Sequence, residues 1–352
     1  MPSARSAIAL LLTAVFALGS TTYIVQQAGE DVPFSQPVLL QPRAAGAVRG
    51  EGSGPEQEGG PVANALSIPN LMERPLEGSG FTLGRVLAET ASYTRHYITY
   101  KSGNLTISGI MNIPKGEAPF PLLILNHGYI DTSVYTNGRG LRREQDYFAS
   151  RGFAVLHPDY RCHAQSDCAE MDDLERRFGY VRDVMNAVDA VRKANLPGVD
   201  ARRVGMLGHS MGGGVTINAL VAKPDLIAAA MLYAPVSADA QENFARWTER
   251  RPAEAQKVIA TYGTPDANPM FWDDYSAKNF LSHITAPVQI HHGTADDSVP
   301  LAWSEDLQRD LLALGKQSEL FTYPGEPHEF AAAWGTVMQR TEAFFRAALT
   351  ER

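Results

Sequence analysis

Short, continuous apolar runs recur along the middle and C-terminal parts of the chain, and a helical pattern follows most of them. Strands that are apolar on both faces and that alternate with helices are typical of a parallel sheet covered by helices on both sides. The sequence therefore predicts an α/β fold with a mostly parallel, doubly wound sheet. The runs are Leu122–Leu125, Phe153–Leu156, Val204–Leu207, Ile227–Tyr233 and Val288–Ile290, with an edge strand expected at Leu320–Tyr323.

An antiparallel hairpin is expected before these runs. Tyr93–Tyr100 is rich in aromatic and β-branched residues, and apolar residues alternate in Leu105–Ile113. The short connector Ser102–Asn104 contains a glycine, which suits a tight hairpin turn. The last part of the chain repeats apolar residues from Trp334 to Phe345 with the spacing of a buried helix face.

The alternation of strands and helices breaks at about residues 237–283. This segment contains two helix-like pieces with tryptophan, tyrosine and arginine residues, among them Trp247, Trp272 and Tyr275. We expect a small helical insertion above the sheet, over the functional site.

Composition narrows the class of protein. The 352 residues include 44% hydrophobic and 20% charged residues, as in an ordinary globular protein with a sizeable core. The formal net charge of −8 argues against a nucleic-acid partner, which would be recognised by a basic stripe. Cys162 and Cys168 are the only cysteines, too few for a disulfide framework or a four-thiolate zinc site.

The N-terminal 61 residues are expected to lie outside the fold. Arg5 precedes an apolar run from Ala7 to Leu18, and small residues follow, as in a secretory signal peptide. An uncleaved anchor, which would attach the chain to a membrane, is the alternative interpretation of residues 1–27. Residues 28–61, rich in Gly, Pro, Glu and Gln, are expected to be a disordered linker. Residues 62–352 would then be an extracytoplasmic domain, secreted or periplasmic.

The strongest functional motif is Gly-x-Ser-x-Gly at residues 208–212. It follows the Val204–Leu207 strand and precedes a helix with Ile217, Leu220 and Val221 on one face. Glycines on both sides of Ser210 permit a strained strand-to-helix turn that raises the serine hydroxyl above the sheet. This context predicts that Ser210 is a nucleophile.

A serine nucleophile needs a base and an acid that orients the base. Four of the nine histidines follow Ser210 by a full segment of the domain, namely His283, His291, His292 and His328. His328 both follows a strand and comes after a loop that carries acids, so His328 is the predicted base.

The acid is expected in the loop that follows the Val288–Ile290 strand. Asp296 and Asp297 are adjacent there, and Asp296 is preferred because it lies closer to the end of the strand. Asp297 remains the alternative, and one of the two could instead cap the helix that begins near Pro300.

An oxyanion formed at Ser210 needs two backbone donors. The amide of Met211, at the start of the helix, and the amide of Tyr129, after Gly128, are the candidates; the Tyr129 ring could also form a wall of the acyl site. Cys162, His163 and Cys168 lack a fourth ligand, so neither a metal site nor a cofactor is predicted. Outside the cytoplasm, a disulfide between Cys162 and Cys168 is the expected use of the two thiols.

Taken together, these motifs resemble the α/β-hydrolase superfamily, and within it the catalytic domain of the prolyl oligopeptidase family and dienelactone-hydrolase-like serine hydrolases. The resemblance implies an eight-stranded sheet, a Ser210–His328–Asp296 triad and hydrolysis of an ester or amide. Full-length peptidases of that family carry an N-terminal β-propeller, for which the residues before Tyr93 are too few. The matching segments are the hairpin ending at Pro114, His127–Gly128, Ala149–Leu156, Pro158–Arg161, the Ser210 turn, Phe271–Ser276, His292–Asp296 and Tyr323–His328.

The sequence therefore predicts a serine hydrolase that forms an acyl-enzyme, either a carboxylesterase or a serine-type peptidase. Its expected partner is a small-molecule ester or a short peptide. Residues 208–213 also resemble the secreted polyester-degrading cutinases, which lack an insertion of this size. A non-catalytic binding protein that retains the fold is the other alternative.

Overall fold

The computed structural model describes residues 64–349. The predicted signal peptide or anchor, residues 1–27, and the predicted linker, residues 28–61, lie outside the described residues. Within the described part of the chain, no helix is both long enough and apolar enough to cross a bilayer.

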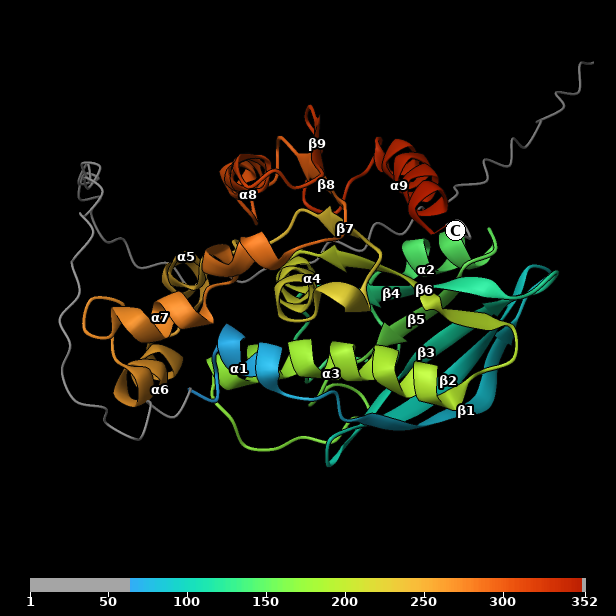
Figure 1. Cartoon of the computed structure of the whole chain (residues 1–352), viewed down its shortest axis with the longest axis horizontal. Helices are drawn as coiled ribbons and strands as arrows, with labels where there is room; N and C mark the ends of the chain where they lie inside the picture. The colour runs from blue at the N-terminus through green and yellow to red at the C-terminus, as the bar shows by residue number, and fades with distance from the viewer. Residues whose placement is uncertain (1–63, 350–352) are drawn as a thin grey trace, which may run out of the picture. The chain divides into compact units, whose positions relative to one another are not determined.

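One mixed sheet organises the described residues (Figure 1). Its strand order is β1-β2-β3-β5-β4-β6-β7-β8-β9; the pairs from β1 to β5 by way of β2 and β3 are antiparallel, and the remaining pairs are parallel. All eight strands expected from the sequence are present. The strands are β1 (Gly78–Glu89), β2 (Tyr93–Ser102), β3 (Leu105–Pro114), β4 (Phe120–Asn126), β5 (Ala154–Pro158), β6 (Val199–His209), β7 (Ala229–Tyr233), β8 (Val288–Gly293) and β9 (Ser318–Tyr323).

The ninth strand, β1, corrects the expectation of an eight-stranded sheet. It pairs with β2 at the edge of the sheet, and most of its side chains are exposed or half-buried. Three register shifts interrupt the pairing, and glycines stand at Gly78, Gly80 and Gly84. A strand that buries little and contains several glycines lacks the period-2 alternation by which strands are recognised.

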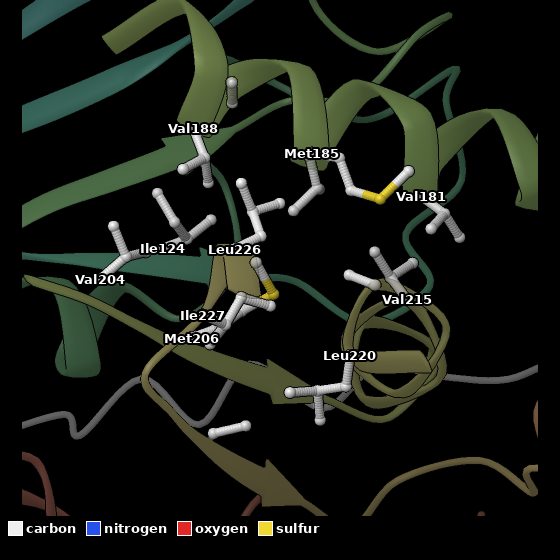
Figure 2. Packing of buried hydrophobic residues seen from close by; sticks show 14 of the residues in the cluster. Ile124, Val181, Met185, Val188, Val204, Met206, Val215, Leu220, Leu226 and Ile227 are labelled. Carbon is white, nitrogen blue, oxygen red and sulfur yellow. The ribbon is translucent and has the colours of Figure 1, made fainter. Parts of the chain in front are cut away.

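Alternate residues of the central strands enter two separate cores, one on each face of the sheet. Leu122 and Ile124 of β4 belong to one apolar cluster, whereas Leu123 and Leu125 belong to the other. Figure 2 shows the first cluster, in which Ile124, Val204 and Met206 face residues of two helices. This two-sided burial explains why the strand sequences are continuously apolar.

Helices cover both faces. α3 and α4 pack on the first core, whereas α2 and α9 pack on the second (Figure 1). α3 begins with a capping box in which Asp172 and Glu175 satisfy each other's backbone amides. The α-helices are α1 (Ile68–Glu73), α2 (Arg142–Ala149), α3 (Asp173–Ala194), α4 (Met211–Ala222), α5 (Ala240–Asn243), α6 (Pro252–Tyr262), α7 (Pro269–Tyr275), α8 (Leu301–Ala313) and α9 (Trp334–Ala348).

The segment between β7 and β8 contains α5, α6 and α7, together with a π-helical turn at Phe244–Thr248 and a 3₁₀ helix at Ala277–His283. Its apolar side chains form a third, smaller cluster around Phe244, Phe271 and Trp272. The helical segment expected at about 237–283 is therefore present, in more pieces than the two that the sequence suggested.

Candidate active site

Ser210 lies on a strained turn between β6 and α4. Its backbone has φ 55° and ψ −120°, a conformation that is rare for a residue with a side chain. The turn requires glycine on both sides, because a Cβ on Gly208 would lie 2.2 Å from the Gly212 carbonyl oxygen and one on Gly212 would lie 2.0 Å from that of Asn126. The local sequence therefore forces the serine to the apex of the turn.

Asp296 and His328 meet beside this turn, although one follows β8 and the other follows β9. His328 Nδ1 lies 2.6 Å from Asp296 Oδ2, and the carboxylate side chain is almost fully buried. Because Nδ1 faces the carboxylate, Nε2 is left to accept a proton. Burial opposes ionisation of Asp296, but hydrogen bonds from His292, His328 and the Val299 amide outweigh it and lower the pKa of the carboxyl group.

The alternative acid and bases are engaged elsewhere. Among the described residues, the Asp297 side chain accepts only from the Ser298 hydroxyl, and Asp297 is exposed. His291 lies between the Tyr323 hydroxyl and the Gln289 side chain, and burial lowers its pKa to about 3. His292 contacts the Ser304 hydroxyl and lies 3.2 Å from Asp296, so it is a second imidazole on the same acid, a contact that the sequence did not predict.

The predicted oxyanion donors flank Ser210. Met211 is the first residue of α4, and Tyr129 follows Gly128 in the loop after β4. A Cβ on Gly128 would lie 3.2 Å from Ser210 Cβ, so this loop packs against Ser210. Within residues 64–349, no backbone hydrogen bond uses the amide of Met211 or Tyr129. The Tyr129 ring is 65% exposed.

Two hollows adjoin the turn. A cleft of about 430 Å³ is lined by residues that include Tyr129, Ser210 and His328. A smaller cavity of about 80 Å³ lies behind Met211, and Trp247 lines both hollows. Because Trp247 belongs to the π-helical turn, the inserted segment forms a wall of the site, as expected.

Two residues of the cleft were not singled out from the sequence. His209 precedes the serine, and its Nε2–H donates to the His328 carbonyl oxygen at 3.3 Å. Arg143, near the start of α2, donates to the carbonyl oxygens of Glu329 and Phe330. The position of His209 inside the motif was the available signal for it; Arg143 had none, because its partners lie 186 and 187 residues away.

A buried polar cluster supports the oxyanion side of the site. Asp159 accepts from the hydroxyls of Ser108 and Tyr135, the Asn137 amide group and the Gly138 backbone amide. These bonds fix the loop that runs from β4 to α2. His127, next to Gly128, stacks on Tyr160 with 4.2 Å between ring centroids.

The turn after β5 closes the same cluster. Cys162 and Cys168 form a disulfide, and His163 between them packs edge-on against His127. Tyr160, Cys162 and Ala164 all have positive φ, so this turn is strained. The Cys162–Cys168 disulfide holds it. No group of three or more His, Cys, Asp or Glu side chains in the described ranges is placed to hold a metal ion.

A mostly parallel sheet with helices on both faces, and a serine on a sharp turn between a strand and a helix, defines the α/β-hydrolase class of serine hydrolases. Residues 139–352 match the model of the prolyl oligopeptidase family of peptidases, and the chain belongs to that family.

Individual relatives are distant. The uncharacterized peptidase YuxL of Bacillus subtilis is 25% identical over 234 residues, which are 62% of this chain and 32% of YuxL. The chain thus spans about a third of that relative's length.

Two solved structures share the fold. The acylaminoacyl peptidase of Pyrococcus horikoshii has a TM-score of 0.58 at 18% identity, over 73% of this chain and 42% of that one. Acetyl xylan esterase 1 of Thermoanaerobacterium also has a TM-score of 0.58, at 16% identity, over 82% of this chain and 94% of that one.

Proposed function

We propose that the protein hydrolyses small esters or amides through a Ser210–His328–Asp296 triad and an acyl-enzyme intermediate. The observation that carries the proposal is the 2.6 Å contact between His328 Nδ1 and Asp296 Oδ2 in the cleft that Ser210 lines. This contact fixes the imidazole tautomer whose Nε2 accepts the serine proton.

The proposed reaction has two halves. Ser210 Oγ attacks the substrate carbonyl carbon while its proton passes to His328 Nε2, and Asp296 stabilises the resulting imidazolium. The amides of Met211 and Tyr129 donate to the oxyanion of the tetrahedral intermediate. His328 then protonates the leaving group, and the acyl-enzyme remains. In the second half, water loses a proton to His328 and attacks the acyl carbon; the bond from that carbon to Ser210 Oγ then breaks, His328 returns the proton to Oγ, and the acid leaves.

The test of the nucleophile is Ser210→Ala, combined with labelling by a fluorophosphonate probe. We expect the wild type to take up one probe molecule, and the variant to take up none and to lose on the order of 10⁴- to 10⁶-fold in turnover. An unchanged thermal unfolding curve would show that the variant is folded. Turnover within tenfold of the wild type would overturn the assignment.

For the substrate, we propose a short acyl group. Met211, whose amide is a proposed oxyanion donor, lines the cavity of about 80 Å³, and Val236, Phe244 and Trp247 contribute to its largely apolar wall. An acyl chain that points away from the leaving group would enter this cavity, which has room for only a few carbon atoms.

Nitrophenyl esters of increasing chain length, alongside aminoacyl anilides, test the substrate class. We expect kcat/KM to be highest for acetyl to butyryl esters and to fall for octanoyl esters. Trp247→Ala should move the optimum to longer chains, whereas Ile259→Ala, on the outer surface of the same inserted segment, should leave it unchanged. A wild-type preference for octanoyl esters would contradict the short-acyl proposal, and a preference for anilides would assign a peptidase.

We also propose an extracytoplasmic location. Disulfides persist in oxidising compartments, and Cys162 and Cys168 are paired while the chain has no other cysteine. Cell fractionation followed by N-terminal sequencing tests this: a start after about residue 20 would show a cleaved signal, and an intact membrane-bound chain would show an anchor. Recovery of the intact chain in the cytosol would contradict the proposal.

A further inference from the structure

Three successive carbonyl oxygens in the loop that carries His328 accept hydrogen bonds from side chains of the cleft. His209 Nε2 donates to the His328 carbonyl at 3.3 Å. Arg143 Nη2 donates to the Glu329 carbonyl at 2.7 Å, and its Nη1 donates to the Phe330 carbonyl at 3.4 Å. The loop is therefore held through its backbone as well as through the His328 imidazole.

His209 is itself held between rigid neighbours. Its ring lies 4.6 Å, centroid to centroid, from both the Tyr233 ring and the His328 ring. On the other edge of the ring, a Cβ on Gly128 would lie 3.2 Å from Nδ1. The His209 imidazole thus contacts both the loop of the proposed base and the loop of a proposed oxyanion donor. His209 is also the residue that precedes Ser210 in the chain.

Arg143 is anchored in a comparable way. Its guanidinium lies over the Trp334 ring, 5.1 Å from the centroid, at the start of α9. The indole N–H of Trp334 donates to the buried Glu144 carboxylate at 2.6 Å. Arg143, a residue of α2, therefore also contacts the start of α9, the helix that follows the loop.

The loop needs such support because its backbone is irregular. Phe330 has a φ of 45°, a left-handed conformation that is uncommon for an aromatic residue. A small displacement of the loop would move His328 Nε2 relative to Ser210, and errors of about 1 Å in a catalytic group can cost on the order of 100-fold in rate.

We propose that His209 and Arg143 are positioning residues, which hold the base His328 through the carbonyls of its own loop while Asp296 holds its imidazole. This inference rests on the proposed triad. The charge states agree with it: burial and the nearby His328 lower the pKa of His209 to about 3, so His209 is neutral at working pH and does not compete for the serine proton.

The first experiment compares His209→Phe with His209→Gln. Phenylalanine keeps the ring but has no donor, whereas the glutamine amide can still donate to the His328 carbonyl. We expect kcat to fall about 10- to 100-fold in the phenylalanine variant and by no more than about threefold in the glutamine variant, with KM nearly unchanged in both. We expect similar melting temperatures for the two variants. Higher activity in the glutamine variant would then be due to the restored donor and not to better packing.

The second experiment compares Arg143→Met with Arg143→Lys, using Arg151→Met as a control outside the cleft. We expect the methionine variant to lose about tenfold in kcat for neutral and anionic esters alike. The lysine variant should recover only part of the loss, because one ammonium cannot bond two carbonyls with the geometry of the guanidinium fork. The Arg151 variant should match the wild type.

Several results would overturn the inference. Wild-type kcat in His209→Phe, or equal losses in the phenylalanine and glutamine variants, would show that the hydrogen bond to His328 does not position the base. A rise in KM confined to anionic esters would make Arg143 a substrate-binding residue instead. Ser210→Ala, measured alongside, separates the two levels: retained turnover there would refute the triad, whereas loss there with an active His209→Phe would refute only the positioning role.

Discussion

The two sides of the cleft place histidines in opposite environments. On one side, His328 is partly exposed and rests on Asp296, which accepts from it at 2.6 Å. On the other side, His127 and His157 are fully buried beneath the oxyanion loop, and burial lowers the pKa of His157 to about 4. Both sides contain a buried aspartate, so the presence of a carboxylate does not explain the difference.

The two environments differ in how deeply the histidines are buried and in what each carboxylate is already bonded to. Asp159 is surrounded by four donors from hydroxyl and amide groups, so its oxygens are occupied. Asp296 bonds two backbone amides through Oδ1 and keeps Oδ2 for imidazoles. A carboxylate with a free oxygen can stabilise an imidazolium beside it, and Asp296 has such an oxygen facing His328, the proposed base.

The largest effect is expected on the side that must take a proton. His328→Ala should lower turnover by on the order of 10⁴-fold or more, because no base is then left to accept the serine proton. His283→Ala, an exposed histidine of the inserted segment, is the control and should behave as the wild type. Steady-state kinetics check both. Turnover within tenfold of the wild type in His328→Ala would move the base elsewhere.

Asp296→Asn tests whether the free carboxylate oxygen is the decisive feature. The amide cannot stabilise an imidazolium as a carboxylate does, so we expect a loss on the order of 10³- to 10⁴-fold in kcat. Asp297→Asn should stay within about threefold, because the Asp297 side chain bonds only a neighbouring hydroxyl. The reverse ranking of the two variants would assign the acid to Asp297.

Gly128→Ala addresses the oxyanion side. The added methyl group would lie 3.2 Å from both Ser210 Cβ and His209 Nδ1, so the loop that carries the Tyr129 amide must shift. Loss of one oxyanion donor typically lowers kcat by about 10²- to 10³-fold. Gly335→Ala, which has open space in α9, serves as the control. Equal kinetics for the two variants would exclude Tyr129 as a donor.

The buried histidines should affect the pH dependence of the free energy of unfolding rather than the rate of turnover. Because the pKa of His157 is lower in the folded protein than in the unfolded chain, the unfolded chain binds more protons as the pH falls. Stability is therefore complete above about pH 6.5 and declines toward about pH 4, by about 3 kcal/mol for this group. Urea unfolding at several pH values should show this decline, and His157→Phe should reduce it. An identical pH dependence in the variant would contradict the assignment.

The smallest effect is expected from the disulfide beside His163. Its loop is short, with a separation of six residues, so reduction should cost about 2 kcal/mol and lower the melting temperature by about 5 °C. Calorimetry with and without a reductant measures this, and a Cys162→Ser/Cys168→Ser variant should not respond to the reductant. Alkylation of both thiols in unreduced protein would show that the bridge does not form.

The sequence was most informative where a local pattern determines the structure. The apolar runs marked the strands because each is buried on both faces, and the glycines around Ser210 marked the turn because no other residue fits there. The apolar runs and the glycine motif can be recognised from neighbouring residues alone. Asp296 and His328 were then selected by the order of their loops along the chain.

Features that depend on distant contacts were missed. His209 meets the His328 carbonyl across 119 residues, and Arg143 meets the Glu329 carbonyl across 186. Neither pairing leaves a period or a spacing in the sequence. β1 was missed for a different reason: as an exposed edge strand, it buries too little apolar surface to produce a pattern.

The inserted helices between β7 and β8 pack around a third apolar cluster, built on Phe244, Phe271 and Trp272, which Leu174 at the start of α3 joins. Substitutions within this third cluster can therefore reshape the wall that Trp247 provides without disturbing the strands that hold Ser210. The proposed substrate pocket and the sheet that holds Ser210 therefore rest largely on different sets of apolar side chains.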